Sequence, residues 1–224
     1  MIRRLRRKRA GRVGIGSRAT YGIGAIALGT TAAVAAGEIT RVWRRGRAPL
    51  PTETDDVIGA AEEATRQTVE VARAGYRGAP TRETALLNLL ASFSLTFGLC
   101  RVSTRFIRAR GQMGPFRELK VGRRHIHHFI PGIATAFLSG GAAVLSRKES
   151  LDKWLAVPFG MGVAATLDES ALLLELDDVY WTEEGLVSVQ ITLAVLALLA
   201  SAALALRVLR RGEAQVLESP GSPA

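Results

Sequence analysis

The sequence predicts an all-α polytopic membrane protein: a bundle of about five transmembrane helices with one amphipathic helix outside the membrane. Three observations predict this fold. The chain of 224 residues is 48% hydrophobic with a mean hydropathy of +0.17, yet 22% of its residues are charged. The charges are segregated from the apolar residues, and five windows of 17–22 residues carry few or no charges. About 20 apolar residues are enough to cross the hydrocarbon core of a bilayer.

The five windows are residues 19–37, 84–100, 125–146, 154–174 and 185–206. The fourth is the least regular, because it contains Asp168 and Glu169. Small residues recur every four positions in the first, third and fourth windows, a spacing that lets helix backbones approach closely in lipid. We therefore expect a first span within residues 19–42 and a membrane core domain over residues 83–211.

The basic segment 1–18 allows a second interpretation of the first span. It carries eight Lys or Arg residues, the following apolar part is short, and Ala33-Val34-Ala35 resembles a signal-peptide cleavage site. The first window is therefore either a retained span or a cleaved signal peptide. Both interpretations place the segment that follows outside the cytoplasm.

Residues 43–82 are expected to be extracytoplasmic and to contain an amphipathic helix over residues 51–76. Thr52 and Thr54 are candidate N-caps, and Gly78 and Pro80 end the pattern. Apolar residues keep helical spacing on one face of this segment; they are Val57, Ala61, Ala64 and Val71. The last stretch, residues 212–224, is rich in Ser, Pro and Gly and is expected to be a disordered tail.

The distribution of basic residues predicts the orientation. Residues 1–18 and 101–124 each carry eight Lys or Arg, and such segments stay in the cytoplasm. With the Ala, Arg, Gly and Leu bias of a GC-rich genome, this predicts a multi-pass protein of the bacterial cytoplasmic (inner) membrane with a cytoplasmic N-terminus. Charge counts favour a re-entrant fourth segment, whereas its length favours a full crossing, which we adopt.

Several classes are disfavoured by composition. The net charge of +10 is spread along loops between apolar windows, which argues against nucleic-acid binding. Cys100 is the single cysteine, so neither a disulfide framework nor a cysteine metal cluster is possible. The lipid bilayer is the predicted partner. The sequence assigns no catalytic residue, no organic cofactor and no oligomeric state, and leaves open whether the protein is an enzyme.

Polar residues near the third and fourth windows form the candidate site. Asp168 follows 14 uncharged residues and extends the small-residue ridge of Gly160 and Ala164 by four positions, so it should face a neighbouring helix. The crossing topology brings it to the membrane level of the histidines. The predicted divalent-metal ligands for Zn, Mn or Fe are His125, His128, Asp168 and Glu169, with His127, Glu175 and Asp178 as further candidates.

Three other interpretations of these residues stay open. The same side chains could form a proton or ion pathway. Arg123 and Arg124, with the histidines, could bind an anionic lipid headgroup. Finally, the cluster could be structural, with its carboxylates paired to arginines and the protein acting as a non-enzymatic scaffold.

Three runs resemble a family of bacterial integral membrane proteins of uncharacterised activity. They are RRHIHHFIPG at residues 123–132, LDE at 167–169 and DVYWTEEG at 178–185. The resemblance covers roughly residues 120–207. It implies a membrane location and no particular activity.

Overall fold

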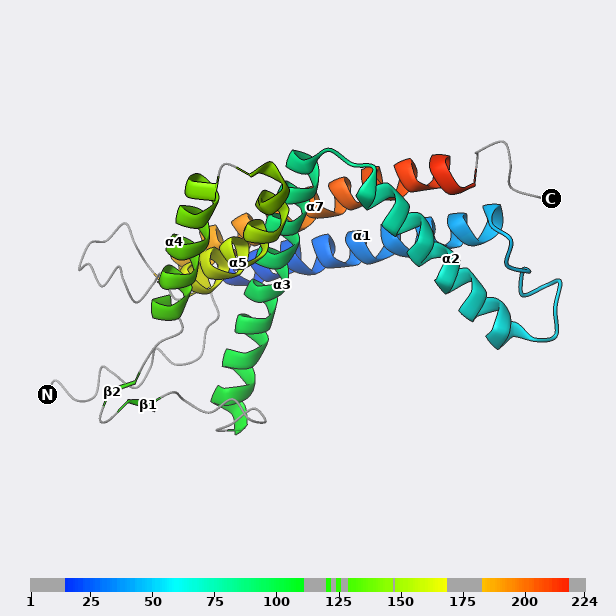
Figure 1. Cartoon of the computed structure of the whole chain (residues 1–224). Coiled ribbons are helices and arrows are strands. Elements are labelled where there is room, and N and C mark those ends of the chain that lie inside the picture. The colour runs from blue at the N-terminus through cyan, green and yellow to red at the C-terminus, as the bar shows by residue number, and fades with distance from the viewer. Residues whose placement is uncertain are drawn as a thin grey trace, which may run out of the picture.

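The chain is helical over nearly all of the residues that its structure, a computed structural model, describes: 15–110, 120–121, 124–125, 129–146, 148–168 and 183–217, with side chains within 22–103, 130–146, 148–168 and 190–217. The helices in this part are α1 (Ile15–Arg45), α2 (Val57–Arg77), α3 (Thr81–Arg110), α4 (Phe129–Ser146), α5 (Glu149–Asp168) and α7 (Glu183–Val216). The exception is a short antiparallel ladder of β1 (Lys120–Val121) and β2 (Arg124–His125) (Figure 1).

Three of the described helices are long and apolar enough to cross a membrane. These segments are Gly22–Arg45 of α1, Thr81–Ser103 of α3 and Gln190–Val216 of α7. A shorter apolar helix, Ile130–Ser146, lies in α4. Length and composition therefore indicate a multi-pass membrane protein whose apolar helix faces contact lipid.

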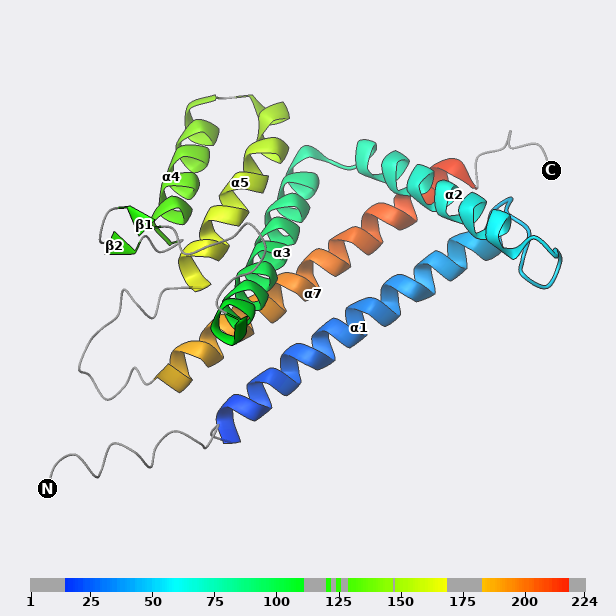
Figure 2. The same cartoon turned by 90° about the horizontal axis from the view of Figure 1, so that it is seen from below.

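Helices α1 and α7 lie side by side and run in the same direction (Figure 2). Near their starts, a Cβ on Gly24 would lie 3.8 Å from Ile191. Near their ends, Glu38 pairs with Arg210 at 3.1 Å. The two helices therefore begin at one end of the bundle and finish at the other.

Helix α3 crosses α7 obliquely and runs in the direction opposite to α1 and α7 (Figures 1 and 2). Glu83, near its start, pairs with Arg211 near the end of α7. Arg101, further along α3, donates a hydrogen bond to Gln190 near the start of α7. The two contacts fix the antiparallel register of α3 and α7.

Helices α4 and α5 form an antiparallel hairpin that packs on α3 through small residues. A Cβ on Gly162 would lie 2.6 Å from the backbone nitrogen of Ala136 in α4, and one on Gly160 would lie 2.4 Å from the carbonyl oxygen of Leu89 in α3. The small-residue ridges of the third and fourth windows therefore pack as expected. The ridge of the first window does not, because Gly29 and Gly37 have open space beside them.

Helix α2 lies across the end of α7 and begins later than the sequence predicts. Asp56, rather than Thr52 or Thr54, is its N-cap, because the Asp56 carboxylate accepts a hydrogen bond from the Gly59 amide at 2.9 Å. Thr54 instead accepts a hydrogen bond from the Asp56 amide. Asn88 of α3 ties α2 to α5 by donating to the Tyr76 hydroxyl and the Lys153 carbonyl.

Two further boundaries correct the sequence prediction. Helix α7 continues to Val216, so residues 212–216 are helical rather than part of a disordered tail. Helix α4 begins at Phe129, and His125 belongs to β2 rather than to the helix. Pro131 lies in the first turn of α4, where its missing N–H removes no helix bond, and this favours a start near Phe129.

Candidate functional site

Asp168 is the best-defined polar residue of the predicted site, and it faces a neighbouring helix as predicted. It is the last residue of α5, and its side chain is 4% exposed. Its Oδ1 lies 2.6 Å from Nε of Arg101 in α3. This is an ion pair at contact distance, although its angles are not those of an aligned hydrogen bond.

Gln190 of α7 completes a three-helix cluster with these two residues. Its amide nitrogen donates to the Leu167 carbonyl at 2.6 Å and reaches the Asp168 carbonyl at 3.5 Å. Its amide oxygen accepts a hydrogen bond from the Arg101 guanidinium. We call Arg101, Asp168 and Gln190 the Asp168 cluster.

The end of α5 explains why these residue types are needed. The last carbonyls of a helix have no partner within the helix, and the helix dipole makes this end negative. Gln190 satisfies the Leu167 carbonyl, and the Arg101 cation compensates both the dipole and the Asp168 carboxylate. The cluster thus neutralises a helix end that would otherwise be costly to bury.

Apolar side chains cover the cluster on the side facing the centre of the bundle. Phe93, Phe97, Ala164 and Ala197 form the buried core there. The Arg101 guanidinium lies over the Phe97 ring, 5.1 Å from its centroid, a cation–π arrangement. Arg101 keeps 31% of its side chain exposed, so the arginine reaches solvent or headgroups while its carboxylate partner does not.

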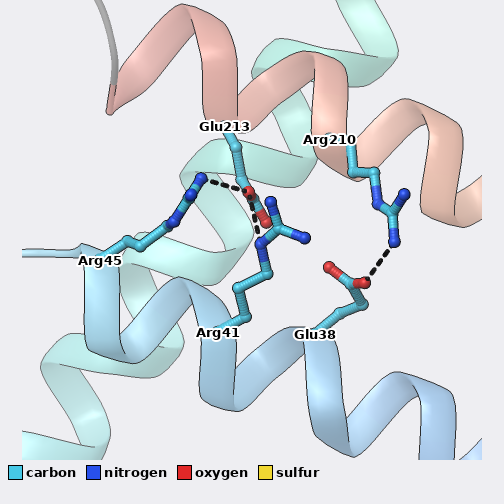
Figure 3. A network of polar contacts seen from close by, with 5 residues as sticks. All are labelled: Glu38, Arg41, Arg45, Arg210 and Glu213. Atoms are coloured by element: carbon cyan, nitrogen blue, oxygen red, sulfur yellow. Dashed lines mark hydrogen bonds and ion pairs between the residues drawn. The ribbon is translucent and has the colours of Figure 1, made fainter.

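A second polar group, the Glu213 layer, lies at the opposite end of α7. Glu213 is 3% exposed, and one carboxylate oxygen lies 3.3 Å from Arg41 and 3.7 Å from Arg45 of α1. Figure 3 shows Glu213 between these two arginines, with Glu38 and Arg210 paired beside them. The layer also includes the pair of Glu83 and Arg211.

The spacing of the two polar groups matches a bilayer. Gln190 and Glu213 are 23 residues apart in α7, which is about 35 Å at 1.5 Å per residue. Glu83 and Arg101 are 18 residues apart in α3, or about 27 Å. A hydrocarbon core is about 30 Å thick. A helix that is tilted from the bilayer normal needs a longer stretch than an upright one to cross it.

Most of the other predicted site residues lie outside the described residues. They are Arg123, His127, His128, Glu169, Glu175 and Asp178. His125 and Arg124 are described only as backbone of β2, at the end of the hairpin where α4 begins and α5 ends (Figure 2). Among the residues that are described, no group of three or more His, Cys, Asp or Glu could hold a metal ion. The metal-site prediction therefore stays a prediction.

Arg101 and Gln190 belong to the Asp168 cluster although the sequence pattern does not predict them as site residues. Arg101 ends the second apolar window and was used only as its boundary. Gln190 carries no charge, so it does not interrupt the fifth charge-free window. A buried amide inside an otherwise apolar span is a usable signal, since it needs a hydrogen-bonding partner there.

Comparisons with protein-family models, with curated proteins and with solved structures found no match to this chain.

Proposed function

We propose that this protein is a non-enzymatic, multi-pass membrane scaffold in which the Asp168 cluster fastens the α4–α5 hairpin to α3 and α7. The observation that carries the proposal is the ion pair of Arg101 with the buried Asp168 carboxylate, 2.6 Å apart. Among the described residues, the Arg101 cation pairs with the Asp168 carboxylate and the Gln190 amide bonds the Leu167 carbonyl. This is the arrangement expected of a structural cluster that joins helices.

The lengths of α4 and α5, taken with the helix directions, support five crossings. Helices α4 and α5 have 18 and 20 residues, or about 27 and 30 Å, which suits a hydrocarbon core of about 30 Å. The parallel course of α1 and α7 places the end of α7 on the same side as α2. A re-entrant fourth segment would instead return the end of α7 to the side of the N-terminus. The basic segments 1–18 and 101–124 favour a cytoplasmic N-terminus in a bacterial inner membrane.

The proton-pathway alternative lacks the residues that it requires. Between the Asp168 cluster and the Glu213 layer, no Asp, Glu, Lys, Arg or His occurs in the described spans, namely residues 22–37, 84–100, 130–146, 154–167 and 191–206. A proton relay across the bilayer uses a chain of such groups. The structural interpretation needs no such chain.

Backbone hydrogen exchange of the full chain in detergent tests the proposal. Arg101→Gln should accelerate exchange throughout α4 and α5, because the buried Asp168 carboxylate loses the Arg101 cation that ties it to α3. The matched control is Arg66→Gln, which removes an arginine from an exposed ion pair on α2. Unchanged exchange in α4 and α5 of the Arg101 variant would refute the fastening role.

A further inference from the structure

An apolar groove lies beside the Glu213 layer, at the opposite end of the bundle from the Asp168 cluster. Its volume is about 380 Å³, within the usual range for ligand pockets. It lies between α1 and α7 and is bordered by α2 and α3. Small side chains leave the space, since Ala35, Ala72, Ala202 and Ala205 contribute to its wall.

The groove runs from the polar layer toward the middle of the membrane. Glu38 lies at its polar end, and Thr31, which also lines it, is seven residues earlier in α1. On α7, the lining residues extend from Ala202 to Leu209, which are also seven residues apart. Seven residues span about 10 Å of helix, less than half of a hydrocarbon core of about 30 Å. The groove therefore lies within one leaflet.

Charged groups of both signs stand at the polar end of this groove. Arg210 is 59% exposed and pairs through one nitrogen with Glu38, which is 12% exposed (Figure 3). The second carboxylate oxygen of Glu38, Oε2, is buried and has no hydrogen-bond partner. Arg41 and Arg45 stand beside them on α1. This end of the groove thus has an excess of cations, and the Glu38 carboxylate beneath Arg210 has hydrogen-bonding capacity to spare.

We propose that this groove binds one acyl chain of a phospholipid whose headgroup carries a hydrogen-bond donor. Phosphatidylethanolamine is such a lipid. The exposed Arg210 side chain turns from Glu38 to the phosphate, and the headgroup donor takes its place beside the Glu38 carboxylate. The apolar walls match the acyl chain, and the cation and the acceptor match the two ends of the headgroup. Phosphatidylcholine offers the phosphate without a donor, so it should bind more weakly.

The location favours a phospholipid over other apolar occupants. The groove begins at the level of the polar layer and deepens into the apolar part of the bundle, as a lipid does from headgroup to tail. A free fatty acid would bring a carboxylate toward Glu38 without a donor. An apolar peptide would leave Arg210 and the Glu38 oxygen without partners.

Lipid binding to the purified full chain tests this proposal. Native mass spectrometry and thermal unfolding are measured in detergent with phosphatidylethanolamine, phosphatidylcholine of the same chains, or inorganic phosphate. We expect one phosphatidylethanolamine per chain, a raised Tm, and roughly tenfold weaker phosphatidylcholine binding, equivalent to about 1.4 kcal/mol. Equal binding of the two lipids, or equal stabilisation by inorganic phosphate, would overturn the proposal.

Three variants locate the bound lipid. Ala205→Phe fills the groove and should abolish binding, whereas Ala203→Phe, at an exposed position of α7 outside the groove lining, should not. Glu38→Gln should remove the preference for phosphatidylethanolamine but keep phosphate binding, with Glu63→Gln on α2 as its control. If the two phenylalanine variants bind equally, or Glu38→Gln keeps the full preference, the lipid does not lie in this groove.

Discussion

Gly75 of α2 and Gly212 of α7 lie at a point where the two helix backbones touch. A Cβ on Gly75 would lie 1.8 Å from the Val208 carbonyl oxygen, and one on Gly212 would lie 1.9 Å from the Val71 carbonyl oxygen. No real Cβ occupies such a position, so only glycine permits this crossing. The close approach holds α2 across the end of α7, beside the Glu213 layer.

Alanine at either position should therefore detach α2 from α7. We expect Gly75→Ala and Gly212→Ala each to lower the free energy of unfolding by about 1–3 kcal/mol, as overpacking typically does. Thermal unfolding in detergent measures the loss. Gly37→Ala is the control, because a Cβ there meets open space. Equal effects at Gly37 and Gly75 would mean that the crossing contributes nothing specific.

The parallel course of α1 and α7 predicts that the α2 segment and the end of α7 share one side of the membrane. In a Cys100→Ser background, single cysteines at Thr52 and Ala214, both exposed positions, should react equally with an impermeant reagent in whole cells. Labelling of Thr52→Cys but not of Ala214→Cys would favour a re-entrant fourth segment. Labelling of neither, with reaction after lysis, would invert the orientation.

The ion pair of Glu63 and Arg66 on α2 predicts that the stability contributed by this pair depends on pH. Two hydrogen bonds from the Arg66 guanidinium lower the pKa of the Glu63 carboxyl below its ordinary value. The pair therefore stabilises the fold above the ordinary carboxyl pKa, and this contribution is lost as the pH falls through the lowered pKa. An NMR titration of Glu63 should move toward the ordinary value in Arg66→Gln. An unchanged titration midpoint of Glu63 in this variant would show that Arg66 does not lower the Glu63 pKa.

The sequence located the membrane helices more reliably than it located their ends. Charge-free windows mark only the apolar part of a helix. The helix itself continues for as long as its backbone hydrogen bonds form and its charged side chains find partners. Arg45 and Glu213 lie beyond their windows yet inside helices, because the ion pair between α1 and α7 makes charged turns stable there. Pattern alone does not reveal that compensation.

For the candidate site, the sequence predicts the direction in which Asp168 faces but not the residue with which it pairs. The ridge through Gly160 and Ala164 indicated that Asp168 faces another helix, and it does. Its partner could not be read from the sequence, since the pairing depends on which helices are neighbours. Arg101 lies 67 residues earlier on α3, and α3, rather than the histidine-bearing start of α4, supplies the described partner.

The metal prediction can be separated from the structural role by elemental analysis. In our account, Arg101 and Gln190 hold the end of α5, so Asp168→Asn should leave the metal content of the purified protein unchanged. His128→Ala serves as the comparison, because a histidine site would lose metal in that variant. Stoichiometric metal that is lost in both variants would establish Asp168 as a ligand and refute our account.

The ion pair also predicts an asymmetry between its two members. Arg101→Gln removes the Arg101 cation from a carboxylate that is 4% exposed, and breaking a buried ion pair in this way typically costs about 3–5 kcal/mol. Asp168→Asn leaves a guanidinium that is 31% exposed and lies over Phe97, so water can compensate part of the loss. The arginine variant should therefore be the less stable one.

A double-mutant cycle over Arg101 and Asp168 tests the central claim most directly. The unfolding free energies of wild type, Arg101→Gln, Asp168→Asn and the double variant are measured in detergent, with Glu63 and Arg66 as a control cycle. We predict that the double variant loses clearly less stability than the sum of the single losses, and that the exposed control pair shows a much smaller coupling. Additive losses over Arg101 and Asp168, equal in size for the two single variants, would contradict the account.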